Sequence, residues 1–147
     1  MDIILEILSN KMLINALLSW ALAQVIKTII YAIVNKGIDW HRLMGDGGMP
    51  SGHSATVTSL AVTAALVYGL DSGIFALAAV LAIVVMHDAM GVRLEAGKHA
   101  KALNELFNII GKNDSPEVML KEFLGHTPSQ VVCGALLGLV VALVMSL

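Results

Sequence analysis

Ten residues decide how the rest of the chain is arranged, and they read Gly47-Gly48-Met49-Pro50-Ser51-Gly52-His53-Ser54-Ala55-Thr56. Pro50 has a fixed φ and suits the first turn of a helix, and we expect Ser51 or Ser54 to cap that turn. The amide N–H groups of a helix start, with the positive end of the helix dipole, favour an anion such as phosphate. The stretch therefore predicts either a phosphate-binding helix start that includes His53 or a capped helix with an incidental histidine.

The composition indicates a membrane protein. The chain has 147 residues, 57% of them hydrophobic and 14% charged, and its mean hydropathy is +0.81. Soluble domains are about half apolar and about a quarter charged. The length predicts a single domain over residues 1–147, and the net charge of −2 gives no reason to expect nucleic acid as a partner. Cys133 is the one cysteine, which excludes an internal disulfide and a cysteine-based metal cluster.

The hydropathy pattern predicts an all-α, polytopic helix bundle. About four apolar segments are expected to span the membrane, at residues 12–34, 54–70, 74–86 and 129–147. Residues 2–9 are apolar but too few to span a bilayer, and we expect a short N-terminal helix there. From 91 to 112, apolar residues recur at helical spacing between charges, which predicts an amphipathic helix lying at the membrane surface. This helix begins an interfacial insertion expected over 91–123. Ser115 and Pro116 then form a start signal for a short helix through Phe123.

The alternation of spans places the polar motifs at one face of the membrane. The polar loop at 35–50 joins the first two spans, and a tight turn at 71–73 sends the chain back. Most basic residues fall on the face that carries the motifs, namely Lys36, Arg42, Arg93, Lys98, Lys101, Lys112 and Lys121. By the positive-inside rule that face is cytoplasmic, and we expect the plasma membrane of a bacterium.

Lys27 lies inside the first span, where a charge is costly. Intramembrane charges usually face the protein interior or water, so Lys27 is a candidate functional residue. The alternative is that its side chain reaches along the lipid to the interface.

Three motifs in chain order resemble those of the type-2 phosphatidic acid phosphatases, a superfamily that also includes the vanadium haloperoxidases. They are Gly47-Gly48-Met49-Pro50-Ser51-Gly52-His53-Ser54, His87-Asp88-Ala89-x-Gly91-Val92-Arg93 and Leu124-Gly125-His126-Thr127-Pro128. The combination is most similar to the small divergent branch of that family, and it covers roughly residues 20 to 140. The resemblance implies hydrolysis of phosphate esters through a phosphohistidine, without a metal or other cofactor, at a site that also takes vanadate or phosphate.

The resemblance also implies roles for individual residues. His126 matches the nucleophile, and His53 matches the general acid that protonates the leaving oxygen. Neutral imidazole is a nucleophile and imidazolium an acid near neutral pH, so the two roles suit two histidines. The phosphate oxygens would be held by the remaining matched residues, Lys27, Ser51, the Gly52 amide and Arg93.

The chain departs from the family pattern in two places. Val34 stands where the first motif has an arginine, and we expect Arg42 of the polar loop to supply the guanidinium. Gln130 stands where the third motif has an aspartate. Glutamine accepts a hydrogen bond from a ring N–H but does not stabilise imidazolium as a carboxylate does. We expect Asp88 to supply that carboxylate from the end of the third span.

Two classes of function compete. The first is an integral-membrane phosphatase that hydrolyses a lipid or isoprenoid phosphate. The alternative is a catalytically impaired protein on the same scaffold that binds phosphate headgroups or transports lipids. A metal site from His53, His87, Asp88 and His126 is disfavoured, because these residues lack helical metal-ligand spacing. Besides the bilayer, a second copy is an expected partner, through the small-residue spacing of Gly134 and Gly138.

Overall fold

A computed structural model describes residues 3–37, 47–110, 120–122 and 124–146, with the side chain of Ile110 left out. This part of the chain forms α-helices in the order α1 (Ile3–Ser9), α2 (Lys11–Asn35), α3 (Gly52–Tyr68), α4 (Gly73–Met90), α5 (Val92–Ile110) and α6 (Pro128–Ser146). The predicted all-α class is confirmed, and each expected span lies within a few residues of an observed helix.

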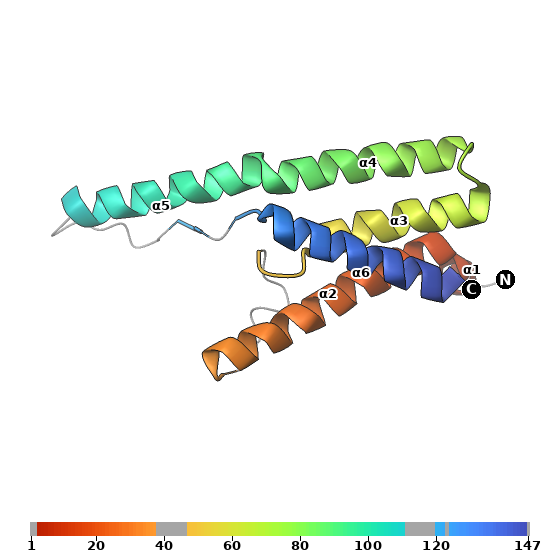
Figure 1. Cartoon of the computed structure of the whole chain (residues 1–147), viewed down its shortest axis with the longest axis horizontal. Coiled ribbons are helices and arrows are strands. Elements are labelled where there is room, and N and C mark those ends of the chain that lie inside the picture. Colours follow the sequence, from red (N-terminus) through yellow and green to blue (C-terminus); the bar gives the residue numbers. More distant parts are fainter. Residues whose placement is uncertain (1–2, 38–46, 111–119, 123, 147) are drawn as a thin grey trace.

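The bundle is built around α3, which contacts α2, α4 and α6 (Figure 1). α2 and α6 also contact each other, so that α2, α3 and α6 enclose one common interior. α4 and α5 run almost in one line, and α5 continues beyond the end of the bundle (Figure 1). The expected amphipathic helix is therefore present, but it extends the direction of α4 instead of folding back across the bundle end.

Small residues allow the helices to pack closely. Ala23, Ala55, Ala64 and Ala142 have no exposed surface. A Cβ on Gly134 of α6 would collide with the carbonyl oxygen of Ser51, the cap of α3, and one on Gly138 would collide with that of Ala55 in α3. The small-residue spacing in α6 thus serves contact between α6 and α3 within one chain, which is how such spacings bring helices together in membranes.

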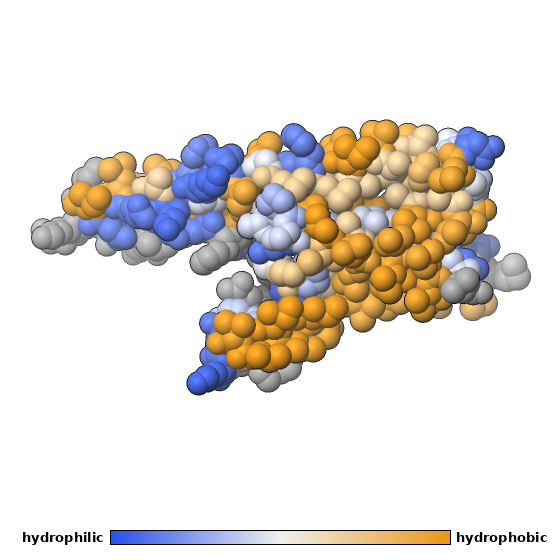
Figure 2. All heavy atoms as spheres, viewed as in Figure 1, coloured by the Kyte–Doolittle hydropathy of each residue, from blue (hydrophilic) through white to orange (hydrophobic). Residues whose placement is uncertain are grey.

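The large apolar side chains lie outside. Ile33 is 72% exposed and Leu77 is 76% exposed, and hydrophobic residues cover much of the bundle in Figure 2. Within the described ranges, three helical segments are long and apolar enough to cross a membrane: Lys11–Asn35, Gly73–Ile109 and Pro128–Ser146. α3, with 17 residues, is about 25 Å long and packs among them. An apolar exterior around a small-residue interior is the arrangement of a membrane helix bundle.

Two local expectations differ from the structure. Ser51 caps α3 as expected, but Pro50 precedes the cap and lies outside the first turn. The reason is that the Ser51 side chain accepts from the amide of Ser54, which fixes Gly52 as the first helical residue. Most of the short helix expected at 115–123 lies outside the described residues, and residues 120–122 are not helical.

Candidate functional site

Backbone hydrogen bonds gather three separate motifs at one end of the bundle. The amide of His126 donates to the carbonyl of Ala89 at 2.9 Å, which joins the segment before α6 to the last turn of α4. The amide of Ser51 donates to the carbonyl of Gln130 at 3.0 Å, which joins the start of α3 to the first turn of α6. The motifs therefore meet because main-chain N–H and C=O groups at the helix ends form hydrogen bonds with one another.

The two histidines of the motifs face each other at this end. The ring centroids of His53 and His126 are 5.8 Å apart, with the rings inclined by 64°. His126 is 2% exposed, and His53 is half-buried near the start of α3. The convergence that the resemblance implied for this pair is therefore present in the fold.

Gln130 orients the ring of His126. Its Oε1 lies 3.3 Å from His126 Nδ1 and also accepts from the amide of Thr127 at 3.0 Å. Thr127 precedes α6 and Gln130 is three residues further on, which is the spacing of a capping box. An amide oxygen here accepts from a protonated Nδ1 and so leaves the lone pair on Nε2.

The surroundings of His126 favour the neutral imidazole. Burial lowers the pKa of His126 below its usual 6.5, while the hydrogen bond to Gln130 acts in the opposite direction. The nearby charges of Lys27 and His53 lower this pKa further, and a hydrogen bond with the Gly48 backbone raises it slightly. The lowered pKa favours the uncharged ring near neutral pH, and the uncharged ring is the form that can act as a nucleophile.

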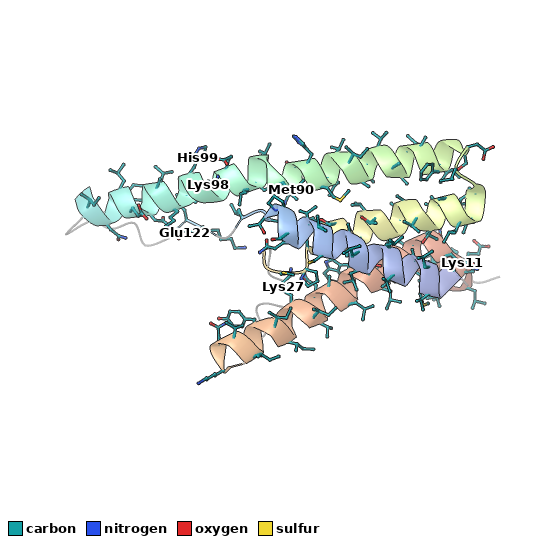
Figure 3. The ribbon with its side chains drawn as sticks, in the orientation of Figure 1. Lys11, Lys27, Met90, Lys98, His99 and Glu122 are labelled. Atoms are coloured by element: carbon teal, nitrogen blue, oxygen red, sulfur yellow. The ribbon has the colours of Figure 1, made fainter. Side chains whose placement is uncertain are left out.

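Lys27 lies beside the loop that carries Gly48. It is 5% exposed, so its side chain is enclosed by protein and does not extend along the lipid. A Cβ on Gly48 would lie 3.2 Å from Lys27 Cγ and Cδ, and Gly48 has a φ of +83°. Both the left-handed backbone and the close lysine stem favour glycine there. Figure 3 shows Lys27 at the site end and Lys11 at the opposite end.

Ser51 and Gly52 are buried at the helix start. The Ser51 Oγ accepts from the Ser54 amide at 3.3 Å and from the Ser54 hydroxyl at 3.0 Å. Its own O–H is the group that can donate to an anion, since its amide already bonds to Gln130. Gly52 is the first residue of α3, so its N–H belongs to the set that has no partner within the helix.

Asp88 and Arg93 pair with each other at the junction of α4 and α5. Arg93 Nε lies 2.6 Å from Asp88 Oδ2, and the two side chains are 51% and 40% exposed. The place beside His126 Nδ1, where we expected the Asp88 carboxylate, is occupied by Gln130. The structure thus brings together Lys27, Ser51, His53 and His126, with Asp88 and Arg93 engaged separately. Arg42 lies outside the described residues.

Two hollows adjoin Gly48. One is an apolar groove along the end of α2, lined by Lys27, Ile30, Tyr31, Val34, Asn35, Gly48 and Met49. The other lies beside the segment before α6 and is lined by Gly47, Gly48, Leu94, Glu122, Leu124, Gly125, Thr127 and Gln130. In the part of the chain that is described, no three His, Cys, Asp or Glu side chains are grouped so as to hold a metal ion.

Gln130 has a function that the family pattern does not predict. It stands in place of an aspartate, but its side chain both caps α6 and orients His126. The signal was present in the order Thr127-Pro128-Ser129-Gln130, which has the capping-box spacing.

The fold defines a polytopic helical membrane protein with its polar motifs at one end of the bundle. The chain matches the Divergent PAP2 family over residues 8–141 and belongs to that family. It is also similar to the uncharacterized membrane protein YuiD of Bacillus subtilis (strain 168), with 42% identity over 97% of this chain and 98% of that protein. No solved structure gives a significant match. The resemblance to the divergent branch of the phosphatase superfamily is therefore confirmed.

Proposed function

We propose that this protein is an integral-membrane phosphatase that hydrolyses a lipid or isoprenoid phosphate through a phosphohistidine on His126. The observation that carries the proposal is the pair of rings, 5.8 Å apart, in which one imidazole is buried and has its Nδ1 bound by Gln130. Fixing Nδ1 directs Nε2 toward the substrate, and the lowered pKa of His126 keeps that nitrogen unprotonated.

The two histidines have complementary tasks in the proposed reaction. His126 Nε2 attacks phosphorus as the P–O bond to the leaving alkoxide breaks, and the His53 imidazolium gives its proton to that alkoxide. A water then attacks the phosphohistidine, His53 accepts the proton of that water, and phosphate leaves with the His126 lone pair restored. The positive charge of Lys27 and the amides at the start of α3 would offset the charge on the phosphoryl oxygens.

With Gln130 beside His126, we expect slower turnover than with a carboxylate in the same place. An amide holds the ring in place but does not stabilise the positive charge that the imidazole gains on attack. We expect formation of the phosphohistidine to be slower than it would be with a carboxylate in that place.

The two hollows support an amphiphilic substrate. The groove along α2 offers apolar walls to a hydrocarbon chain, and its Lys27 end adjoins Gly48 beside the histidines. The hollow on the other side of Gly48, which is lined by Glu122, Thr127 and Gln130, would admit water. We place this end at the cytoplasmic face, because most basic residues of the sequence belong to the segments that meet there.

The test is a rapid-quench experiment on the full chain in detergent. We would use lipid, isoprenoid and aryl phosphates labelled on phosphorus, with EDTA present. Label on His126 should be stable to base and labile to acid, and His126→Ala should lower turnover at least about a thousandfold, as loss of a catalytic nucleophile does. His99→Ala on α5 is the control, because His99 is exposed on the helix that continues beyond the end of the bundle. Turnover that survives in His126→Ala contradicts the mechanism.

His53→Ala tests the general acid. It should slow formation of the phosphohistidine most with alkyl phosphates, whose leaving oxygen needs a proton, and less with aryl phosphates. Equal slowing with both substrate types would exclude proton donation by His53.

The alternative is a phosphate-headgroup binder or lipid transporter on the same scaffold. Gln130 in place of a carboxylate favours this alternative, as does the engagement of Arg93 by Asp88. Vanadate binding without turnover on any substrate of the panel would support the binder over the enzyme.

A further inference from the structure

Asn104 is a buried polar residue on the largely exposed helix α5. Most side chains of α5 are exposed, whereas Asn104 is 2% exposed. Its Nδ2 donates to the carbonyl of Leu120 at 2.9 Å and to Glu122 Oε1 at 2.8 Å, and its Oδ1 accepts from the amide of Leu120 at 3.0 Å. One carboxamide thus binds both main-chain groups of Leu120, as a neighbouring strand would.

These bonds hold a segment, which we call the strap, along α5: residues 120–122 and 124–125. Gly97 of α5 permits the close approach, because a Cβ there would lie 2.6 Å from the carbonyl oxygen of Glu122. At the other end of the strap, a Cβ on Gly125 would collide with the backbone of Leu94, and Gly125 has a φ of +80°. Two glycines and one asparagine therefore fix the strap against the helix.

The strap leads directly into the site. His126 follows Gly125, and its amide bonds to Ala89 at the end of α4. Glu122 and Gly125 also line the hollow beside Gln130. A displacement of the strap from α5 would therefore be passed through Gly125 to the backbone of His126, and so to the burial of its ring.

We propose that Asn104 is a positioning residue that acts through the strap to hold His126 in its buried place facing His53. The proposal deepens the proposed function by adding a residue, distant in sequence, that keeps the nucleophile in position. Asn104 does not touch the histidines in this arrangement; its effect is on where the chain before α6 lies.

The primary test measures the titration of His126 by NMR on the full chain in detergent with labelled histidine, the resonance being assigned from its loss in His126→Gln. Asn104→Leu removes the three hydrogen bonds and should raise the pKa of His126 toward its usual value, because a freed strap relieves the burial that lowers it. The charged groups that face this ring, Lys27 of α2 and His53 of α3, are unchanged. Vanadate affinity should fall about two- to tenfold, the range for loss of a hydrogen bond.

Asn108→Leu is the matched control, since Asn108 is exposed one turn further along α5 and should change neither quantity. Asn104→Asp sets a carboxylate against Glu122 and should act like Asn104→Leu. Adding Glu122→Gln to Asn104→Asp gives a side-chain amide that can donate to the new carboxylate. The pKa of His126 should then return part of the way to its wild-type value. A merely structural role would alter thermal stability without this recovery.

Gly97→Ala keeps the proposal testable if Asn104→Leu does not fold, because its Cβ pushes the strap from α5 and leaves Asn104 in place. An unchanged pKa of His126 in folded Asn104→Leu or Gly97→Ala would overturn the proposal. The outcome is separable from the proposed function: a wild type that shows no turnover removes the phosphatase, while the titration still decides whether Asn104 positions His126.

Discussion

The two ends of the bundle bury polar side chains from the same three helices in different ways. At the end away from the site, Asn15 Nδ2 of α2 donates to Thr63 Oγ1 of α3 at 3.1 Å and to Ser146 Oγ of α6 at 3.3 Å. At the site end, α2 contributes the buried Lys27, and the histidine pair comes from the first turn of α3 and the segment before α6. One end carries neutral groups that hydrogen-bond to each other, and the other carries a buried lysine and two histidines.

The two ends differ in what their buried polar groups do: those at the far end stabilise the bundle, and those at the site end are suited to bind an anion. A neutral hydrogen-bonded cluster inside a membrane bundle stabilises helix association by a modest amount, about 0.6 kcal/mol per interaction on average. A buried ammonium group is costly in the same setting and is retained where a partner or ligand of opposite charge meets it. Burial of Lys27 beside Gly48, in the loop that leads to the start of α3, therefore supports the proposed anion site at this end.

The largest expected effect is on vanadate affinity, and it tests whether Lys27 or Arg93 binds the anion. Lys27→Met should weaken vanadate binding about tenfold or more, since hydrogen bonds to charged groups contribute ~1.5–3 kcal/mol. Arg93→Met should change it much less, because the Arg93 side chain is half-exposed and pairs with Asp88. Titration calorimetry in detergent measures both variants. A greater loss in Arg93→Met would move the anion site to the junction of α4 and α5.

A smaller effect is expected at the opposite end. Asn15→Ala removes the amide that donates to both Thr63 and Ser146. It should lower the free energy of unfolding by about 0.5–1.5 kcal/mol and leave vanadate affinity unchanged. Leu17→Ala is the control, since Leu17 lies on the exposed side of the same helix. Thermal unfolding in detergent gives the comparison. A change in vanadate affinity in Asn15→Ala would show that the two ends are coupled.

The smallest expected effect is a pH dependence of stability that comes from His126. Its pKa in the folded protein is lowered by burial, so below the usual 6.5 the unfolded chain binds the proton more readily than the folded one. This group therefore makes stability rise as pH increases from the folded pKa to about 6.5, with no further change above that value. Unfolding midpoints across this window should show a steeper rise in the wild type than in His126→Gln. Parallel curves would contradict the lowered pKa.

The sequence by itself determined the membrane class, the approximate positions of the apolar helices, and the end of the bundle at which the two motif histidines lie. These features follow from local information: apolar segments of spanning length, the cap at Ser51, the tight turn at 71–73, and the order of motifs on alternating spans. Alternation alone requires His53 and His126 to lie at the same end, and the structure agrees.

Only the tertiary structure decided which polar groups meet at that end. Asp88 and Gln130 were both candidates for the neighbour of His126, and the sequence favoured the carboxylate on its chemistry. The fold selects Gln130, because the capping box at the start of α6 holds its Oε1 beside Nδ1, while Asp88 pairs with Arg93. The contact of Asn104 with the strap likewise depends on the path of the chain after α5, which no local pattern specifies.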